Sequence, residues 1–353
     1  MSAARQISTM SQSKLLLVAH PSPIHVGGHL ERAAKMLGIP YHLCDLTRAF
    51  EGTYLIAKFN WWLRGRRPLR LRDFSEEVVQ RAKESKPRWL LATGIAPLEK
   101  GALEEMGRMG ILRLNYLTDD PWSAVHQAGW FMEALPYYDQ VFSPRRSNMA
   151  DIHRLGCDAF YMPFAYDPEI HFPESVASNE EKARFTCDVV FVGGADRDRV
   201  QWVAPLIHAG FKVHLYGGYW DRFRETRASA RGIADLQTFR KAVSVARVAL
   251  CLVRRSNRDG HSMRSFELAA MGACILAEDT AEHREIFGED GEAVVYFQGV
   301  EEVVEKLQWL LERESERRRL ALAARARISS RGNTYADRLK DMIRHIPASA
   351  RKD

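Results

Sequence analysis

The feature that most constrains the fold is an apolar segment, residues 248–253, that leads into a charged loop, a helix and a second apolar segment. The helix is expected to begin near Ser262, which can cap it, and to end before Gly272. Residues 273–277 then predict a second strand. Two strands joined through a helix within about thirty residues have the size of one βαβ unit. The sequence therefore predicts a parallel sheet here.

The loop after the first of these strands has the chemistry of an anion site. It opens at the carboxyl edge of the predicted sheet, where open α/β sheets bind their ligands. The following helix directs its free N–H groups and the positive end of its dipole at the loop. Basic side chains gather in the same stretch: Arg254, Arg255, Arg258, His261 and Arg264. We therefore expect a ligand that carries phosphate.

Two acids accompany this site. Asp259 lies in the loop, and Glu267 lies in the helix among the apolar residues 266–271. A carboxylate in such surroundings costs free energy unless something donates hydrogen bonds to it, and a ribose diol would do so. The simpler interpretation is a solvated acid on a capped helix.

The run Met-Arg-Ser-Phe-Glu-Leu-Ala-Ala-Met-Gly-Ala at residues 263–273 resembles the donor site of retaining glycosyltransferases with the GT-B fold. More narrowly, it resembles the CgeB-like family. The resemblance extends from residue 100 to about 340 and is strongest over residues 186–340. It implies that Glu267 binds the ribose of a nucleotide sugar. Asp259 occupies the first acidic position, where the broader group usually has Glu, and would contact the sugar.

A glycine pair begins the other half of the expected donor site. Gly193 and Gly194 follow the strand-like residues 187–192 and let the backbone approach a ligand closely. Arg199 stands where the family tends to have an arginine. The full set expected to bind the donor is Gly193, Gly194, Arg199, His261, Ser262, Met263, Arg264 and Glu267. The positive groups of this set would stabilise the leaving diphosphate.

The first half of the chain also predicts strands, loops and helices, with a strand at residues 14–20, a loop to Gly28 and a helix at 29–37. By resemblance, His20, Gly27 and Gly28 in that loop belong to the acceptor side. The Asp-Asp-Pro that ends the strand at residues 111–117 recurs in the CgeB-like family. It makes Asp119 and Asp120 candidate catalytic residues, although an Asp-Pro turn is the simpler interpretation. No metal site is expected.

Two tandem α/β domains follow from these patterns. The resemblance implies two Rossmann-like, doubly wound domains facing a cleft, with residues 163–168 similar to the crossing segment of GT-B enzymes. The expected divisions are a disordered leader at 1–13, a first domain at 14–168, a linker at 169–185, a second domain at 186–330, and a C-terminal helix and tail at 331–353 that crosses back to the first domain.

A basic, tryptophan-containing segment runs from Trp61 to Arg72. It could rest on an anionic membrane surface or bind an acidic acceptor. The simpler alternative is a helix whose tryptophans pack in the core and whose arginines are solvated.

Composition narrows the functional class. The formal charge of +6 raises the possibility of nucleic-acid binding. The arginines are dispersed and no helix-turn-helix, RNP or zinc-knuckle pattern appears, so no nucleic acid is expected as a partner. The five cysteines are scattered without a CxxC pair, which suits a reducing cytoplasm. No apolar run approaches the length of a spanning helix.

The hypothesis that unites these observations is a glycosyltransferase. It would use a nucleotide-diphosphate sugar as donor substrate, need no cofactor, and act on a glycan, protein or lipid-linked acceptor. Retention of configuration is implied by the resemblance. The alternatives are a sugar-nucleotide epimerase of the same fold and a non-catalytic protein that binds nucleotide or glycan. A dehydrogenase is disfavoured because the first strand is not followed by GxGxxG.

Overall fold

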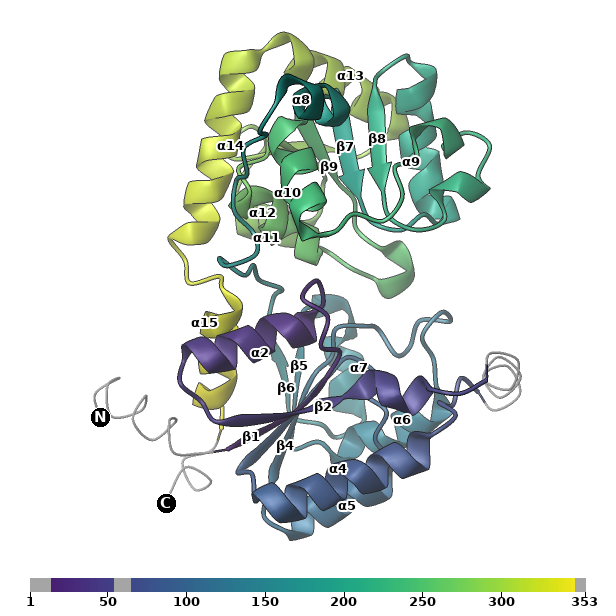
Figure 1. Ribbon diagram of the computed structural model, residues 1–353, viewed down its shortest axis with the longest axis vertical. Coiled ribbons are helices and arrows are strands. Elements are labelled where there is room, and N and C mark those ends of the chain that lie inside the picture. Colours follow the sequence, from purple (N-terminus) through teal and green to yellow (C-terminus); the bar gives the residue numbers. More distant parts are fainter. Residues whose placement is uncertain (1–13, 54–64, 347–353) are drawn as a thin grey trace. The chain divides into compact units, whose positions relative to one another are not determined.

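A computed structural model describes residues 14–53 and 65–346 and divides the chain into two compact units. The first unit contains the residues up to Pro163, together with Ser256–Arg258 and the residues from Tyr335 onward. The second unit contains Phe164–Arg255 and Asp259–Thr334. Each unit has a parallel sheet of its own with helices packed on it (Figure 1). The predicted fold class, α/β with two Rossmann-like domains, is confirmed.

The first unit is built on a six-stranded sheet in the order β2-β1-β3-β4-β5-β6, and all neighbouring strands are parallel. Its strands are β1 (Leu15–Ala19), β2 (Tyr41–Asp45), β3 (Trp89–Thr93), β4 (Leu112–Tyr116), β5 (Gln140–Ser143) and β6 (Ala159–Tyr161). Its helices are α2 (Val26–Met36), α4 (Leu71–Ser85), α5 (Lys100–Arg108), α6 (Gly129–Ala134), α7 (Met149–Arg154) and α15 (Tyr335–Arg344).

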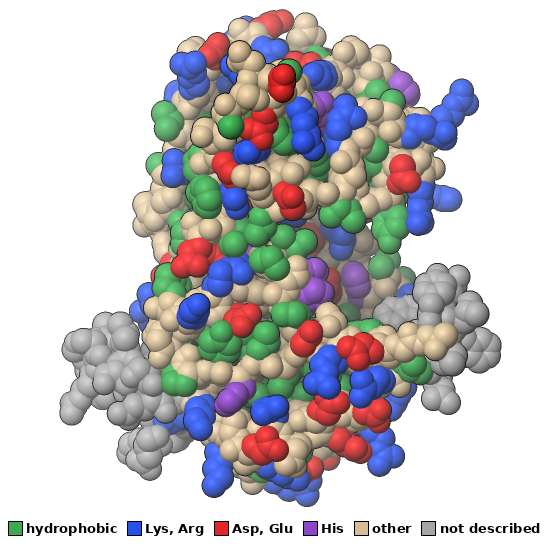
Figure 2. All heavy atoms as spheres, in the orientation of Figure 1, with side chains coloured by type: hydrophobic (Ala, Val, Ile, Leu, Met, Phe, Trp, Pro, Cys, Tyr) green, Lys and Arg blue, Asp and Glu red, His purple; other side chains and the backbone are tan. Residues whose placement is uncertain are grey.

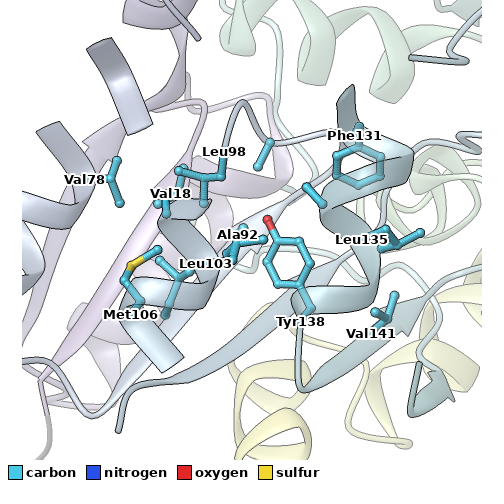
Figure 3. Packing of buried hydrophobic residues seen from close by; sticks show 14 of the residues in the cluster. Val18, Val78, Ala92, Leu98, Leu103, Met106, Phe131, Leu135, Tyr138 and Val141 are labelled. Atoms are coloured by element: carbon cyan, nitrogen blue, oxygen red, sulfur yellow. The ribbon is translucent and has the colours of Figure 1, made fainter. Parts of the chain in front are cut away.

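Both faces of this sheet are buried, which is why its central strands are continuously apolar. Successive side chains of a strand point to opposite faces, so Val18 and Ala92 join one core cluster while their neighbours face the other way. Figure 3 shows Val18 and Ala92 packed with Leu103 of α5 and Val78 of α4. Burying a side chain of this size stabilises the fold by about 1.5–3 kcal/mol. Helices α2 and α15 pack against each other.

Helix α2 begins earlier than the sequence predicts. It starts at Val26, so Gly27 and Gly28 lie in its first turn and not in the preceding loop. A Cβ on Gly27 would come within 2.5 Å of the carbonyl oxygen of His20, so the helix can approach the end of β1 only with glycine there. The N-cap residue is His25, which makes no capping hydrogen bond with its side chain. The usual start signal is therefore missing from the sequence.

The second unit has a five-stranded sheet in the order β11-β10-β9-β7-β8, again with parallel neighbours. Its strands are β7 (Val189–Val192), β8 (Val213–Tyr216), β9 (Val248–Cys251), β10 (Ile275–Glu278) and β11 (Val295–Phe297). Its helices are α8 (Asn179–Phe185), α9 (Arg197–His208), α10 (Leu236–Val245), α11 (Met263–Ala270), α12 (Ala281–Phe287), α13 (Val300–Glu312) and α14 (Glu314–Ser329). Two of these elements, β9 and α11, are the strand and the helix of the stretch from residue 248 to 277 that most constrains the fold.

The boundary between the units differs from the expected one. Residues 164–185 group with the second unit, so the first unit ends at Pro163 and not at residue 168. The expected linker at 169–185 contains helix α8, which Ser178 caps by accepting a hydrogen bond from the Glu181 N–H at 3.1 Å. Its polar composition reflects an exposed helix anchored by the buried Phe185. The leader at 1–13 lies outside the described residues.

Candidate donor site in the second unit

The candidate site is formed by two loops at the carboxyl edge of the second sheet. One joins β7 to α9 and contains Gly193 and Gly194, and the other joins β9 to α11. Strands β7 and β9 are parallel neighbours, so their carboxyl ends meet at the same edge. The side chain of Arg264 links the two loops, because its Nε donates to the carbonyl oxygen of Val192 at 3.0 Å.

The glycine pair allows a tight approach of three chain segments. The N–H of Gly193 donates to the Tyr216 carbonyl at 2.8 Å, and its own carbonyl accepts from the Trp220 indole at 2.8 Å. A Cβ on Gly193 would lie 3.1 Å from the ring of Phe191 and 3.6 Å from Nη1 of Arg199. A larger residue at this position would therefore crowd the Phe191 ring, whereas its contact with Arg199 would be an ordinary one.

Arg199 lies in the first turn of α9, which Asp196 caps through an Arg199 N–H to Oδ1 hydrogen bond of 2.8 Å. Its side chain is buried, and Nη1 donates to the Gly194 carbonyl at 2.9 Å. Among the described residues Nε has no hydrogen-bond partner, although it lies 3.9 Å from Oδ2 of Asp196. Burial lowers the pKa of Arg199, and the like charge of Arg254 lowers it further. The site therefore holds a buried guanidinium with an unused donor.

Arg254 supplies a second positive charge. It follows β9, is half-buried, and forms no hydrogen bond or ion pair through its guanidinium to any residue that the structure describes. Two guanidiniums close enough to affect each other's protonation destabilise the empty site. Asp196 and, to a smaller extent, Asp259 offset part of this charge, because their carboxylates raise the pKa of Arg199. The arrangement favours an anion with more than one charge.

The amino terminus of α11 faces the same loop. Ser262 is its N-cap, and the Ser262 N–H donates to the hydroxyl of Ser265 at 3.1 Å. Ser265 in turn pairs with Nε2 of His283 at 2.8 Å, while Nδ1 of His283 lies 2.7 Å from the Glu278 carbonyl. Burial lowers the pKa of His283 to about 4, so its ring is neutral and holds the helix start in place. Met263, the first helical residue, is half-buried.

The ring of His261 belongs to the scaffold and not to the ligand site. Its Nε2 accepts the Phe164 N–H at 3.1 Å, and its Nδ1 lies 2.5 Å from the carboxylate of Glu282. Both ring nitrogens are therefore engaged, which leaves only the backbone of His261 for a ligand. A contact between His261 and the donor stays a prediction from the sequence.

Arg264 and Glu267 form a pair one turn apart on α11. Besides its bond to β7, the guanidinium of Arg264 contacts Oε2 of Glu267 and lies 4.7 Å from the centre of the Phe239 ring. Glu267 is only 1% exposed. In the structure Arg264 therefore pairs with Glu267, and its predicted contact with phosphate stays a prediction.

The two candidate acids of the first unit differ in their surroundings. Asp120 is fully buried and forms two hydrogen bonds with Arg258, at 2.6 and 3.0 Å. Arg258 also reaches Asp151 at 2.8 Å and has a positive φ of 53°. Asp119 is half-buried, with Oδ2 3.3 Å from the hydroxyl of Thr118. Asp120 thus anchors the segment Ser256–Arg258, whereas Oδ1 of Asp119 lies 3.8 Å from Nε2 of His126.

The expected acceptor-side residues lie at the end of β1. The His20 ring accepts the Ser22 N–H through Nδ1 at 3.1 Å and stacks on His25, with 4.0 Å between ring centres. Gly27 and Gly28 are buried in the first turn of α2, where they serve packing. Of the three predicted residues, His20 is the one that is half-buried, and the two glycines are fully buried.

The basic segment is neutralised within the first unit where the structure describes it. Three arginines of the segment form ion pairs with acidic side chains. These are Arg67 with Glu99, Arg70 with Glu51, Asp73 and Glu77, and Arg72 with Glu76 at 2.9 Å. Arg66 donates to two backbone carbonyls, including that of Gln127 at 2.8 Å. Figure 2 shows positive and negative side chains interspersed over this unit.

Three of the four described arginines of the segment therefore have acidic partners. The predicted contact through Trp61 and Trp62 lies outside the described residues. In the described part of the chain, no helix is long and apolar enough to cross a membrane.

Comparison with known proteins gives a family match over part of the chain and a fold. The family model described as glycosyl transferase-like matches residues 197–344, which include both loops' helices, Arg254 and Glu267. No curated protein matches the chain by sequence. The fold is the GT-B fold of glycosyltransferases such as sucrose-phosphate synthase, and three solved structures share it.

Sucrose-phosphate synthase from Thermosynechococcus elongatus has a TM-score of 0.66 at 12% identity, covering 96% of this chain and 100% of its own. Anabaena HepE in complex with UDP and glucose has a TM-score of 0.62 at 12% identity, covering 94% and 98%. A putative UDP-N-acetylglucosamine 2-epimerase from Listeria monocytogenes has a TM-score of 0.56 at 11% identity, covering 92% and 93%.

Proposed function

We propose that the chain is a glycosyltransferase that takes its sugar from a nucleoside diphosphate sugar. The observation that carries the proposal is the pair Arg199 and Arg254. A buried guanidinium with an unused Nε donor lies beside a second guanidinium without a partner among the described residues. A diphosphate would neutralise both, and charge-assisted hydrogen bonds to phosphate are the strong ones.

The donor fits the site in a definite direction. Its diphosphate lies against the Gly193–Gly194 loop and the amino terminus of α11, where the helix dipole favours negative charge. Glu267 lies five residues after the N-cap, roughly 7.5 Å along the helix axis, and accepts the ribose hydroxyls. Asp259 contacts the transferred sugar. The match to the glycosyl transferase-like family over this region supports the assignment.

The chemistry follows from the charges. The bond between the anomeric carbon and the diphosphate oxygen breaks, and its electron pair moves to the diphosphate. Arg199, Arg254 and the start of α11 stabilise that charge as it develops, without having to reorganise. The acceptor oxygen forms the new bond to the anomeric carbon, and its proton passes to the departing diphosphate. Retention of configuration, and a place in the CgeB-like branch, are parts of this proposal that rest on the sequence resemblance.

Acceptor binding is assigned to the first unit, with His20 and Asp119 as the residues to test. The acceptor would be a glycan, a protein or a lipid-linked group. Asp120 is left out of the catalytic set because its carboxylate is buried against Arg258.

Donor cleavage tests the proposal. Purified protein is incubated with UDP-, GDP-, ADP- and CDP-sugars, and the released nucleoside diphosphate is measured with and without EDTA. We expect slow hydrolysis of one class of donor, unaffected by EDTA, and a loss of that activity in Glu267→Gln. Arg325→Ala, which removes an exposed arginine on α14, is the control and should behave as wild type.

The same experiment separates the alternatives. A protein that only binds nucleotide would retain the donor intact, and an epimerase would return a nucleotide sugar with altered configuration. Neither outcome is compatible with transfer. Failure to bind any nucleoside diphosphate would remove the donor site itself.

A further inference from the structure

A histidine that no motif singles out packs on the proposed ribose acceptor. His171 is 3% exposed, and its Nε2 lies 3.5 Å from Oε1 of Glu267 within the second unit. Its ring also meets the Phe239 ring edge to face, with 6.4 Å between ring centres. Phe239 is the same ring over which the Arg264 guanidinium lies. The carboxylate of Glu267 therefore lies between His171 and Arg264.

A turn that begins at Asp167 positions the His171 ring. The Asp167 carbonyl accepts the N–H groups of Ile170 at 3.0 Å and His171 at 2.7 Å, and its Oδ1 accepts that of Glu169 at 3.0 Å. The Asp167 N–H donates to Nδ1 of His171 at 3.0 Å. The chain thus fixes the ring in both position and orientation, beginning from the Asp-Pro of residues 167–168.

These contacts decide which ring nitrogen carries the proton. Because Nδ1 accepts a backbone N–H, the neutral ring must carry its hydrogen on Nε2. That N–H faces Oε1 of Glu267, although 3.5 Å is too long for a good hydrogen bond. The histidine therefore orients the carboxylate by its dipole without occupying the oxygen.

The result is a buried carboxylate oxygen with unused capacity. Oε2 of Glu267 is paired with Arg264, whereas Oε1 has no hydrogen-bond partner among the described residues. A buried acceptor left unpaired costs about 1–3 kcal/mol, so a ligand hydroxyl that donates to it gains that free energy back. Vicinal ribose hydroxyls are donors of this kind.

We propose that His171 is a positioning residue for Glu267 and sets the preference of the donor site for ribonucleotides over 2′-deoxyribonucleotides. This inference rests on the proposed function, in which Glu267 binds the ribose. His171 keeps Oε1 directed at the ribose hydroxyls while Arg264 holds Oε2. Without His171 the Glu267 carboxylate rotates or binds water. Removal of the 2′-hydroxyl from the ligand then lowers its affinity by a smaller factor.

The test compares paired ligands on paired variants. Dissociation constants are measured by calorimetry for UDP, GDP, ADP and CDP and for their 2′-deoxy counterparts, and the ratio within the tightest pair is followed. His171→Asn places an amide oxygen where Nδ1 accepts from Asp167 but removes the Nε2 donor. His171→Gln places an amide N–H near the position of Nε2. Glu267→Gln serves as the reference for a lost carboxylate.

Wild-type protein should prefer the ribonucleotide by about tenfold or more, the size of one charge-assisted hydrogen bond. The ratio should fall below about threefold in His171→Asn and Glu267→Gln, and His171→Gln should restore most of it. A merely structural histidine would weaken both ligands of the pair equally, so an unchanged ratio in His171→Asn overturns the inference.

The failures are distinguishable. If Glu267→Gln also keeps the wild-type ratio, the ribose assignment of the proposed function is wrong. If no nucleoside diphosphate binds wild-type protein, the donor site as a whole is rejected, and the inference with it.

Discussion

Replacing Arg254 with alanine should have opposite effects on ligand binding and on stability. The guanidinium is half-buried, has no partner among the described residues, and by its charge lowers the pKa of Arg199. In the empty protein it therefore contributes repulsion, of the order of 1 kcal/mol for partly screened like charges. With a diphosphate bound it contributes a charge-assisted contact, worth about 1.5–3 kcal/mol.

The magnitudes give a clear expectation. Arg254→Ala should weaken nucleoside diphosphate binding by roughly 10- to 150-fold, since about 1.4 kcal/mol corresponds to a factor of ten. The melting temperature of the ligand-free protein should stay the same or rise. The affinity for the bare nucleoside should change little, because it lacks the phosphates.

Calorimetry with nucleoside and nucleoside diphosphate, together with thermal unfolding without ligand, measures all three quantities. Arg325→Ala on α14 removes the same charge from an exposed helical position and controls for net charge. A lower melting temperature with unchanged diphosphate affinity would refute the reasoning, because it would make Arg254 a structural residue.

Two further predictions concern buried charges outside the phosphate loop. Asp120→Asn should lower the free energy of unfolding by about 1–3 kcal/mol in urea titrations, because it breaks the ion pair between the buried Asp120 and the partly exposed Arg258. The control Asp73→Asn changes an exposed acid and should alter the free energy of unfolding by no more than about 0.5 kcal/mol. Equal effects of the two substitutions would contradict the role of the Asp120–Arg258 pair. Burial lowers the pKa of His283 to about 4, and that of His214 also to about 4. Between about pH 6.5 and pH 4 these histidines are therefore protonated in the unfolded chain but neutral in the native protein. The free energy of unfolding should fall as the pH drops through this range, by up to about 1.4 kcal/mol per pH unit for each histidine. His283→Gln should reduce that slope, and an unchanged slope would show that this ring titrates normally.

Local patterns were enough to predict the framework of the second unit. The apolar residues of β9, the cap at Ser262 and the stop at Gly272 are signals carried by neighbouring residues, and the structure places β9 and α11 accordingly. The glycine pair after β7 was likewise visible in the sequence. These features depend on backbone conformation and burial, which short stretches of sequence encode.

The direction of charged side chains could not be predicted in the same way. Arg264 turns to the carbonyl of Val192, 72 residues away, and Arg258 turns to Asp120, 138 residues away. Whether an arginine near a loop meets a ligand or the protein depends on such distant partners. His171 was overlooked because it lies in a polar segment interpreted as a linker, and only the fold brings it to Glu267.

The central claim is that the diphosphate of a nucleotide sugar binds at the carboxyl edge of the second sheet. A crystal structure of the protein with the nucleoside diphosphate that binds most tightly tests it directly. We predict that both phosphates lie within hydrogen-bond distance of Arg199 and Arg254, beside Gly193–Gly194 and the start of α11, with the ribose on Glu267. A nucleotide bound in the first unit, or phosphates that touch neither arginine, would contradict the account.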